Sequence, residues 1–357
     1  MSNRKGPILI TGGSGFIGSH VIDRLLDAGD RRVINLDKLT YAGTDLLRDA
    51  PGTQYRFVQG DVADQTLVQE LLKEEAIEQI VHLAAETHVD RSIDGPSPFF
   101  RSNALGTFSL LESVRAYLSS RPTHLAQNFR LLNISTDEVY GSIAAPEMTS
   151  ESAPFQPGSP YSATKAAADH FVGTYYNTYG LPCLTIRASN TFGPRQFPEK
   201  LIPLMTLFAL EGRKLPIYGD GQQVRDWLHV NDHVEAVLRV LAVGRVGQVY
   251  NVGGGNLLSN LQLVTYIVDL VHEFRRQASF EGDCPVPAEV EFVADRPGHD
   301  ARYALNCNKI RAELGWAPQT AFLRGLRETI AWYAKNRDWT SRVLAHGQYN
   351  LDRLGNV

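Results

Sequence analysis

The chain has 357 residues, 43% of them hydrophobic and 21% charged, and a formal net charge of −4 at pH 7. This composition is typical of a folded globular protein and excludes a disordered tail protein, and the acidic balance argues against nucleic acid or a membrane surface as a partner. No apolar run approaches the roughly 18 residues of a spanning helix. Cys183, Cys284 and Cys307 have no paired metal-ligand spacing. We therefore expect no metal site and a cytoplasmic location.

The first half of the chain alternates short β-branched runs with helical stretches. Strands are expected at 7–11, 32–37, 55–61, 79–85 and 129–135, and helices at 15–29, 64–75, about 99–118 and 161–179. Strands that are apolar on both faces are typical of a parallel sheet covered by helices. The pattern predicts an α/β fold with a doubly wound parallel sheet of the Rossmann type.

Beyond about residue 190 the alternation becomes less regular. Pieces punctuated by proline are mixed with expected helices near 232–243, 259–276 and 322–335, and 249–254 resembles one more strand of the sheet. We predict a dinucleotide-binding domain over 1–190, to which about 230–257 return. A smaller interleaved C-terminal α/β domain over 191–229 and 258–357 is predicted to bind the substrate.

A glycine-rich turn follows the first expected strand. Gly12, Gly15 and Gly18 leave room for a tight turn beside a pyrophosphate, and the helix that begins there offers free amides to phosphate. Asp37 ends the second strand, where a carboxylate accepts hydrogen bonds from the adenosine ribose, although it could also be a cap. Because a carboxylate repels a 2′-phosphate, we expect NAD rather than NADP. Asp61 is either an adenine contact or a turn cap.

Two further patterns indicate proton chemistry. Tyr161 and Lys165 are four residues apart on a helix and share a face. If they are not simply a surface pair, the ammonium and a nicotinamide ring should lower the pKa of Tyr161. Asp137 and Glu138 follow the fifth strand, and two adjacent carboxylates there should hold one proton tightly. The alternative is a solvated turn.

Longer segments carry a family resemblance. The glycine spacing resembles the extended short-chain dehydrogenases/reductases, and 136–141 with 161–165 resembles their dTDP-glucose 4,6-dehydratase family. Further matching segments lie at 37–43, 83–92, 197–203, 216–219, 225–227 and 295–300. Related epimerases and decarboxylases usually have another residue in place of Asp137.

The resemblance implies site residues. The implied cofactor contacts are Gly12, Gly15, Phe16, Ile17, Gly18, Asp37, Lys38, Leu39, Thr40, Asp61, Val62, Leu83, Ala84, Ala85, Thr87, Ser102, Tyr161, Lys165 and Thr191. The implied substrate contacts are Thr87, Thr136, Asn190, Glu199, Lys200, Leu201, Pro216, Ile217, Tyr218, Arg225, Asn260, Asp295, Arg296 and His299. Without these motifs, Arg225 and Arg296 would be interpreted as surface ion pairs and Tyr218 as an aromatic at the edge of the core.

The resemblance also implies a redox-neutral dehydration of a nucleotide-diphosphate hexose, for deoxysugar biosynthesis. Tyr161 removes the proton of the sugar 4-hydroxyl while NAD takes the hydride, and Thr136 hydrogen-bonds that oxygen. Glu138 removes the proton at carbon 5, Asp137 protonates the departing 6-hydroxyl, and the hydride returns to carbon 6. A homodimer formed through helices on one face is expected by analogy.

Some alternatives stay open. The chain has Thr87 where the family commonly has Ser and Thr191 where it commonly has Asn, and the stretch between Gly141 and Tyr161 is shorter than in some members. A UDP-hexose could replace the dTDP-hexose, since uracil would contact Tyr218 almost identically. A 4-epimerase or decarboxylase and a non-catalytic NAD-binding protein are the rival interpretations.

Overall fold

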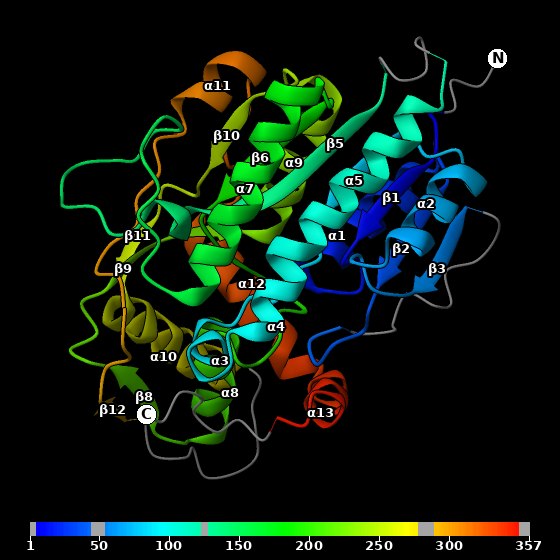
Figure 1. The fold of residues 1–357 in the computed structure, drawn as a ribbon. Coiled ribbons are helices and arrows are strands. Elements are labelled where there is room, and N and C mark those ends of the chain that lie inside the picture. Colours follow the sequence, from blue (N-terminus) through cyan, green and yellow to red (C-terminus); the bar gives the residue numbers. More distant parts are fainter. Residues whose placement is uncertain (1–4, 44–53, 123–127, 278–288, 350–357) are drawn as a thin grey trace.

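The computed structural model describes residues 5–43, 54–122, 128–277 and 289–349, and its central feature is a parallel sheet (Figure 1). The sheet has seven strands in the order β10-β6-β5-β4-β1-β2-β3, with every neighbouring pair parallel. They are β1 (Ile8–Thr11), β2 (Val33–Asp37), β3 (Tyr55–Gln59), β4 (Gln79–His82), β5 (Arg130–Thr136), β6 (Cys183–Ala188) and β10 (Val249–Val252). Because the strand order reverses at β1, the sheet is doubly wound, which confirms the predicted fold class.

Helices cover both faces of this sheet. On one face α2 (Gln65–Glu74), α5 (Gly106–Ser119) and α7 (Pro160–Tyr179) pack together. On the other lie α1 (Phe16–Ala28), α9 (Val230–Val243) and α11 (Asn308–Leu314). The side chains of β1 alternate between the two cores: Ile8 and Ile10 pack on the α1 side and Leu9 on the α5 side, all fully buried. This explains why the strand is a continuous apolar run.

One strand of the structure was not expected, and one expected helix differs. The strand β6 was not predicted, because its start follows Pro182 and it carries the polar Thr185 and Arg187, both buried. The single helix expected at about 99–118 is three pieces, namely α4 (Ser97–Phe99), a π-helix η1 (Phe100–Leu105) and α5. A π-helix has about one more residue per turn than an α-helix. The spacing of hydrophobic residues in the sequence does not show where such a segment begins.

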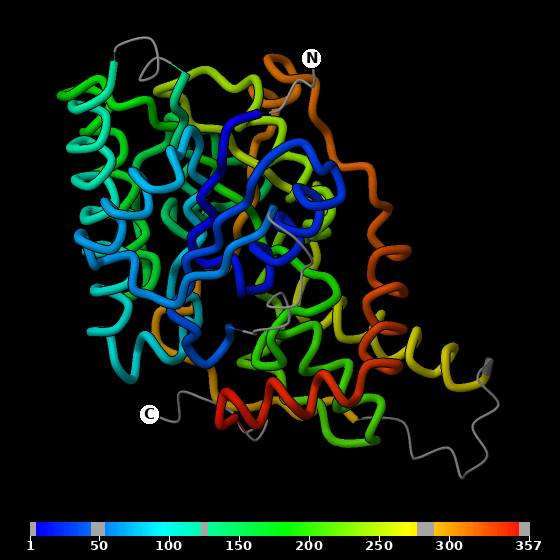
Figure 2. Tube along the Cα trace, turned by 90° about the vertical axis from the view of Figure 1, so that its right-hand side faces the viewer, coloured from blue at the N-terminus to red at the C-terminus, as the bar shows by residue number. Residues whose placement is uncertain are grey.

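The rest of the chain builds a second region below the sheet in Figure 1. It has a three-stranded sheet of β11 (Leu257–Ser259), β9 (Val224–His229) and β7 (Asn190–Phe192), and a parallel pair of β12 (Val290–Val293) and β8 (Leu215–Tyr218). Its helices are α8 (Leu201–Glu211), α10 (Asn260–Gln277), α12 (Phe322–Lys335) and α13 (Arg337–His346). Figure 2 shows α13, in red, along the lower edge of the molecule. The predicted domain boundaries stay a prediction.

Two short helices follow strands of the seven-stranded sheet. They are α3 (Val89–Asp94), after β4, and the 3-10 helix η2 (Asp137–Tyr140), directly after β5. In the described part of the chain, no helix is long and apolar enough to cross a bilayer.

Candidate active site

A cavity of about 620 Å³ lies at the carboxyl ends of the parallel strands. Its wall includes the turn after β1, the ends of β2, β4, β5 and β6, and the start of α7. This is the edge at which doubly wound folds bind ligands, and the volume is that of a small-molecule site.

Most predicted cofactor residues line this cavity. They are Gly12, Gly15, Phe16, Ile17, Gly18, Asp37, Lys38, Thr40, Asp61, Val62, Leu83, Ala84, Ala85, Thr87, Ser102, Tyr161, Lys165 and Thr191. Leu39 does not line it; the backbone N–H of Leu39 instead donates to Asp37 Oδ1 at 2.8 Å.

The glycine turn has no space for side chains. Gly12 has a positive φ of 73°, and a Cβ there would lie 2.6 Å from the backbone nitrogen of Ala84. A Cβ on Gly18 would lie 2.3 Å from the carbonyl oxygen of Gly12. Gly15 caps α1 without a side chain, so none covers the first-turn amides. The turn therefore presents backbone donors to the cavity, as a pyrophosphate requires.

The carboxylate of Asp37 is fixed by the backbone. Its Oδ2 accepts from the N–H of Ser14 at 2.9 Å, and burial raises its pKa. Each oxygen keeps a further lone pair for a ribose hydroxyl. Nearby, Lys38 Nζ donates to Asp61 Oδ2 at 2.7 Å and the N–H of Ala63 donates to Asp61 Oδ1, so Asp61 also acts as a turn cap.

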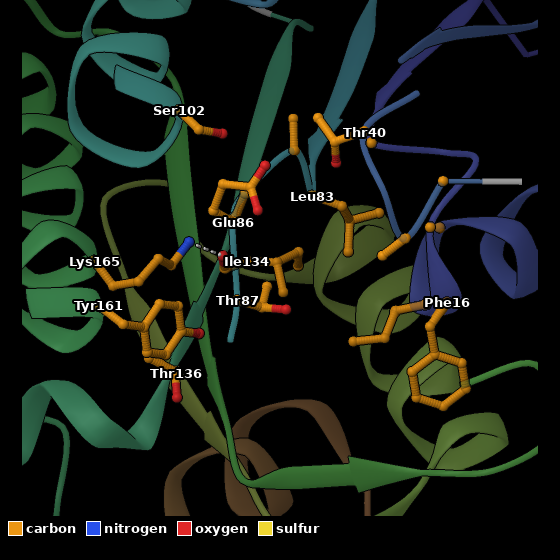
Figure 3. A pocket seen from close by; sticks show the side chains of 18 of the residues that line it. Phe16, Thr40, Leu83, Glu86, Thr87, Ser102, Ile134, Thr136, Tyr161 and Lys165 are labelled. Carbon is orange, nitrogen blue, oxygen red and sulfur yellow. Dashed lines mark hydrogen bonds between the residues drawn. The ribbon is translucent and has the colours of Figure 1, made fainter. Parts of the chain in front are cut away.

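Tyr161 and Lys165 project from the first turns of α7 into the cavity, toward Thr87 and Glu86 (Figure 3). The helix begins with a capping box between Ser159 and Ser162, which fixes where its first turn starts. Lys165 Nζ donates to the carbonyl oxygen of Ile134 at 2.8 Å. Burial lowers the pKa of Lys165 to about 8, against the charge of Asp169, which raises it.

The predicted lowering of the Tyr161 pKa depends on a nicotinamide ring and stays a prediction, because in the chain alone this pKa is raised. The side chain is 7% exposed, and burial raises its pKa, helped by the negative charges of Glu138 and Asp137. Sequence spacing showed the lysine one turn away but did not show that two carboxylates face the same phenol. Any lowering of this pKa must come from positive charge brought into the cavity.

The acid–base pair sits on η2. Asp137 is 3% exposed, and burial raises its pKa well above the usual value, with further contributions from Glu138 and Asp226. Burial also raises the pKa of Glu138, against the opposing charges of Arg296 and Arg225. Thr136 hydroxyl donates to Asp137 Oδ1 at 3.3 Å. The geometry therefore places a carboxyl group that holds its proton more tightly than a free acid beside a second carboxyl.

The predicted substrate residues divide into two groups. Thr87, Thr136, Asn190, Glu199 and Lys200 line the cavity. The remaining ones do not line it, and they are Leu201, Pro216, Ile217, Tyr218, Arg225, Asn260, Asp295, Arg296 and His299. Ile217 is buried in the hydrophobic core, so only its backbone could face a ligand.

Several of the second group nevertheless gather beside the cavity, around α3. Asp90 accepts hydrogen bonds from Tyr218 Oη and from Arg296 Nη1, each at 2.7 Å. The neighbouring Arg91 donates to Glu199 Oε2 at 3.3 Å, and Lys200 Nζ donates to the carbonyl oxygen of Thr87 at 2.8 Å. Arg296 thus pairs with a buried carboxylate, and Arg225, which is 6% exposed, donates to the carbonyl oxygens of Val224 and Asp300, so neither forms the surface ion pair that was the alternative interpretation.

Sequence reasoning missed other lining residues, among them Glu86, Gln196 and His233. Within the described residues, the buried atoms that lack a hydrogen-bond partner include Asp137 Oδ2, Asn190 Oδ1, Gln196 Oε1 and His233 Nε2, all on lining residues. Buried polar groups are normally satisfied, so these atoms indicate a polar ligand. Glu86 lies in the matching segment 83–92, whereas no motif around His233 indicated that it lines the cavity.

The described residues contain no group of three or more His, Cys, Asp or Glu side chains placed to hold a metal. Cys183 and Cys307 are free thiols, and Cys284 lies outside the described residues.

Similarity to known proteins decides the family. Residues 9–329 match the family described as GDP-mannose 4,6 dehydratase. A curated dTDP-glucose 4,6-dehydratase of Xanthomonas campestris is 47% identical over 349 residues, which are 97% of this chain and 98% of the relative. The chain belongs to the dTDP-glucose 4,6-dehydratase family.

Solved structures agree with this family. One of them is the dTDP-glucose 4,6-dehydratase DesIV of Streptomyces venezuelae, whose structure contains NAD. It superposes on this chain with a TM-score of 0.85 at 41% identity, and the match covers 94% of this chain and 99% of DesIV. A Thermus thermophilus UDP-glucose 4-epimerase in complex with NAD is more distant, with a TM-score of 0.80 at 30% identity, covering 92% of this chain and 99% of the epimerase. The family comparison thus favours dehydration over epimerisation.

Proposed function

We propose that this chain is an NAD-dependent hydro-lyase that removes water from dTDP-D-glucose to give dTDP-4-keto-6-deoxy-D-glucose, as a step toward deoxysugars. One observation carries the proposal most directly. Asp137, whose pKa burial raises, and its neighbour Glu138 share one cavity wall with Tyr161 and Lys165. Oxidation alone needs only the Tyr–Lys pair, whereas elimination of water needs an acid and a base as well.

The residues that line the cavity fit NAD. The glycine turn and the first-turn amides of α1 would hold its pyrophosphate, and Asp37 its adenosine ribose. Bound NAD would supply a hydride acceptor for the sugar carbon and return the same hydride later, so that the net redox change is zero. His233, Gln196 and Asn190 offer unpaired polar atoms on the same wall.

In the oxidation half, Tyr161 accepts the proton of the sugar 4-hydroxyl. Its raised pKa in the chain alone means that a nearby positive charge is needed before it can act as a base. Lys165, close to its protonation midpoint near pH 8, provides one such charge from the next turn of the same helix. Thr136 lies on the same wall and hydrogen-bonds the sugar oxygen.

In the elimination half, Glu138 takes the proton from carbon 5, which the ketone at carbon 4 has made acidic. Asp137 gives its proton to the departing 6-hydroxyl, so that water leaves. Burial and the neighbouring carboxyl raise the pKa of Asp137, which favours the protonated form that this role needs. This division of roles is the one that the family resemblance implies, and the deep burial of Asp137, which is 3% exposed, supports it.

The diphosphate is expected near Lys200, Arg225 and Arg296. These side chains act on Glu138 electrostatically, which places their positive charge beside the acid–base pair in an otherwise acidic protein. Arginine suits this role because its planar group donates to two oxygens at once. The hydroxyl of Tyr218 is already bonded to Asp90, which leaves its ring as the surface for the base.

A product assay tests the proposal. Incubation of the purified protein with dTDP-, UDP-, GDP- and CDP-hexoses should give the alkaline absorbance of a keto sugar with dTDP-glucose. Asp137→Asn combined with Glu138→Gln should abolish that product. A 4-epimer without loss of water would favour the epimerase instead, and NAD in the protein with no turnover of any sugar would favour a non-catalytic member.

We also infer a homodimer through α5 and α7. Phe171 and Tyr179 on α7 and Leu105, just before α5, are 37%, 54% and 41% exposed, respectively. Large apolar side chains gathered on two adjacent helices are typical of an interface, and a second copy of the chain presents the same surface. The cytoplasmic location stays a prediction.

A further inference from the structure

A buried polar network centred on Tyr140 lies behind the acid–base pair, away from the cavity wall. Tyr140 ends η2, two residues after Glu138. Its hydroxyl accepts a hydrogen bond from Arg187 Nη1 at 2.7 Å and donates one to Asn251 Oδ1 at 2.8 Å. Arg187 lies in β6 and Asn251 in β10, which are adjacent strands. One phenolic oxygen thus ties the acid–base turn to the sheet.

The same network reaches the helix that carries Tyr161 and Lys165. Arg187 Nε donates to Asp169 Oδ2 at 2.8 Å, and the Asp169 side chain has no solvent exposure. Asp169 lies one helical turn beyond Lys165 on α7. A continuous buried chain of hydrogen bonds therefore links α7 to η2 through Arg187.

Backbone hydrogen bonds hold η2 at few points, and the packing of its side chains supplies the rest of its support. It is only four residues long, and its cap is a bond of 3.3 Å from the N–H of Glu138 to the Thr136 hydroxyl. The N–H of Gln156 donates to the carbonyl oxygen of Val139 at 3.0 Å. A short helix held at few points relies on side-chain anchors for its orientation.

We propose that Tyr140 is a positioning residue, held by Arg187, that keeps Asp137 and Glu138 aligned with the sugar once its 4-hydroxyl has been oxidised beside Tyr161 and Lys165. The assignment rests on the proposed function. It predicts that the two halves of the reaction respond differently to loss of the Tyr140 hydroxyl. The oxidation groups lie on α7, whose first turn has its own capping box, whereas the elimination groups lie on η2.

The hydroxyl of Tyr140 can be removed without removing its ring. The ring packs in a small apolar cluster with Val139, Ala166 and Leu305, which a phenylalanine would preserve. Burial raises the pKa of Tyr140 to about 12, so the hydroxyl stays protonated at neutral pH and can donate to Asn251. Tyr140→Phe therefore keeps the packing of the ring and removes the hydroxyl anchor, together with the donor to Asn251 Oδ1.

The test follows a single turnover of the NAD-loaded enzyme with dTDP-glucose by the absorbance of reduced nicotinamide. In Tyr140→Phe the reduced cofactor should form at a rate close to that of the unmodified enzyme and then disappear about tenfold more slowly, because a small misplacement of reacting groups costs this much or more. Reduced cofactor should therefore accumulate, and kcat should fall while KM stays nearly unchanged. Arg187→Lys, which keeps the charge beside Asp169, should show the same pattern.

Tyr117→Phe is a matched control. Its hydroxyl also makes a buried hydrogen bond, but it ties α5 to the carbonyl oxygen of Ile77 at 3.0 Å rather than to η2. Equal slowing of both phases in Tyr140→Phe, or no slowing of either, would overturn the positioning role. If the unmodified enzyme formed no keto sugar, the proposed function itself would fail, which is a separate outcome.

Discussion

Replacing Gly18 with alanine tests whether the turn after β1 is built for close backbone approach. A Cβ at this position would lie 2.3 Å from the carbonyl oxygen of Gly12 and 2.7 Å from Cα of Gly13. Both neighbours belong to the backbone and cannot rotate away. The turn and the start of α1 must therefore separate by about 1 Å to restore ordinary contact.

The expected magnitudes differ for stability and for binding. Alanine within a helix is about 1 kcal/mol more favourable than glycine, whereas overpacking costs about 1–3 kcal/mol, so the net loss of stability is about 0–2 kcal/mol. Tm should fall by only a few degrees. The affinity for NAD should fall more, by about tenfold to a hundredfold, because losing one hydrogen bond to a charged group costs about 1.5–3 kcal/mol.

The assay measures the NAD released on denaturation, the Kd of the reconstituted protein by calorimetry, and Tm. Gly173→Ala is the control, because no atom lies within 4 Å of the position that a Cβ would take on this exposed glycine of α7. It should leave NAD binding unchanged and raise Tm slightly. Gly18→Ala protein that bound NAD as tightly as the unmodified chain would refute the reasoning.

Three further predictions concern charge and assembly. Burial lowers the pKa of Lys165 to about 8, and the ammonium is the required form, so turnover should fall as pH rises through about 8. In Asp169→Asn, which removes the charge that raises this pKa, the alkaline limb of the pH–rate profile should move to lower pH, and an unmoved limb would contradict the assignment. Asp37→Ser should improve the Kd for NADP relative to NAD by about tenfold or more, since it removes a charge that repels the 2′-phosphate; an unchanged ratio would exclude Asp37 from the ribose site. Tyr179→Glu, at a side chain that is 54% exposed, should shift the sedimentation of the protein toward a monomer, whereas Glu70→Gln on α2 should not.

Local rules account for the parts of the site that could be predicted. The glycine turn is recognisable because only glycine tolerates the φ of 73° and the close approach at Gly12. Tyr161 and Lys165 share a helix face by their spacing alone, and Asp137 follows a buried strand whose end must face the ligand edge of the sheet.

Residues from distant segments could not be placed in this way. His233 reaches the cavity wall from α9, where Thr191 contacts its Nδ1 at 2.9 Å, and nothing near either residue in the sequence indicates the other. The strand β6 was missed because Arg187 looks like a surface residue until Asp169 and Tyr140 are seen to surround it.

The amino-acid sequence by itself determined the fold class, the order of the chemical groups and the family, because hydrophobic period, helix spacing and strand ends are properties of neighbouring residues. Only the tertiary structure showed which surroundings shift the pKa values of those groups. The lowering of the Tyr161 pKa was predicted with a nicotinamide ring beside it, whereas in the chain alone burial and two carboxylates raise this pKa; for Asp137, burial adds to the effect of the neighbouring carboxyl that the sequence predicted. The physical reason is that desolvation and charge–charge interaction depend on distance in space, and here they come from elements far apart in the chain.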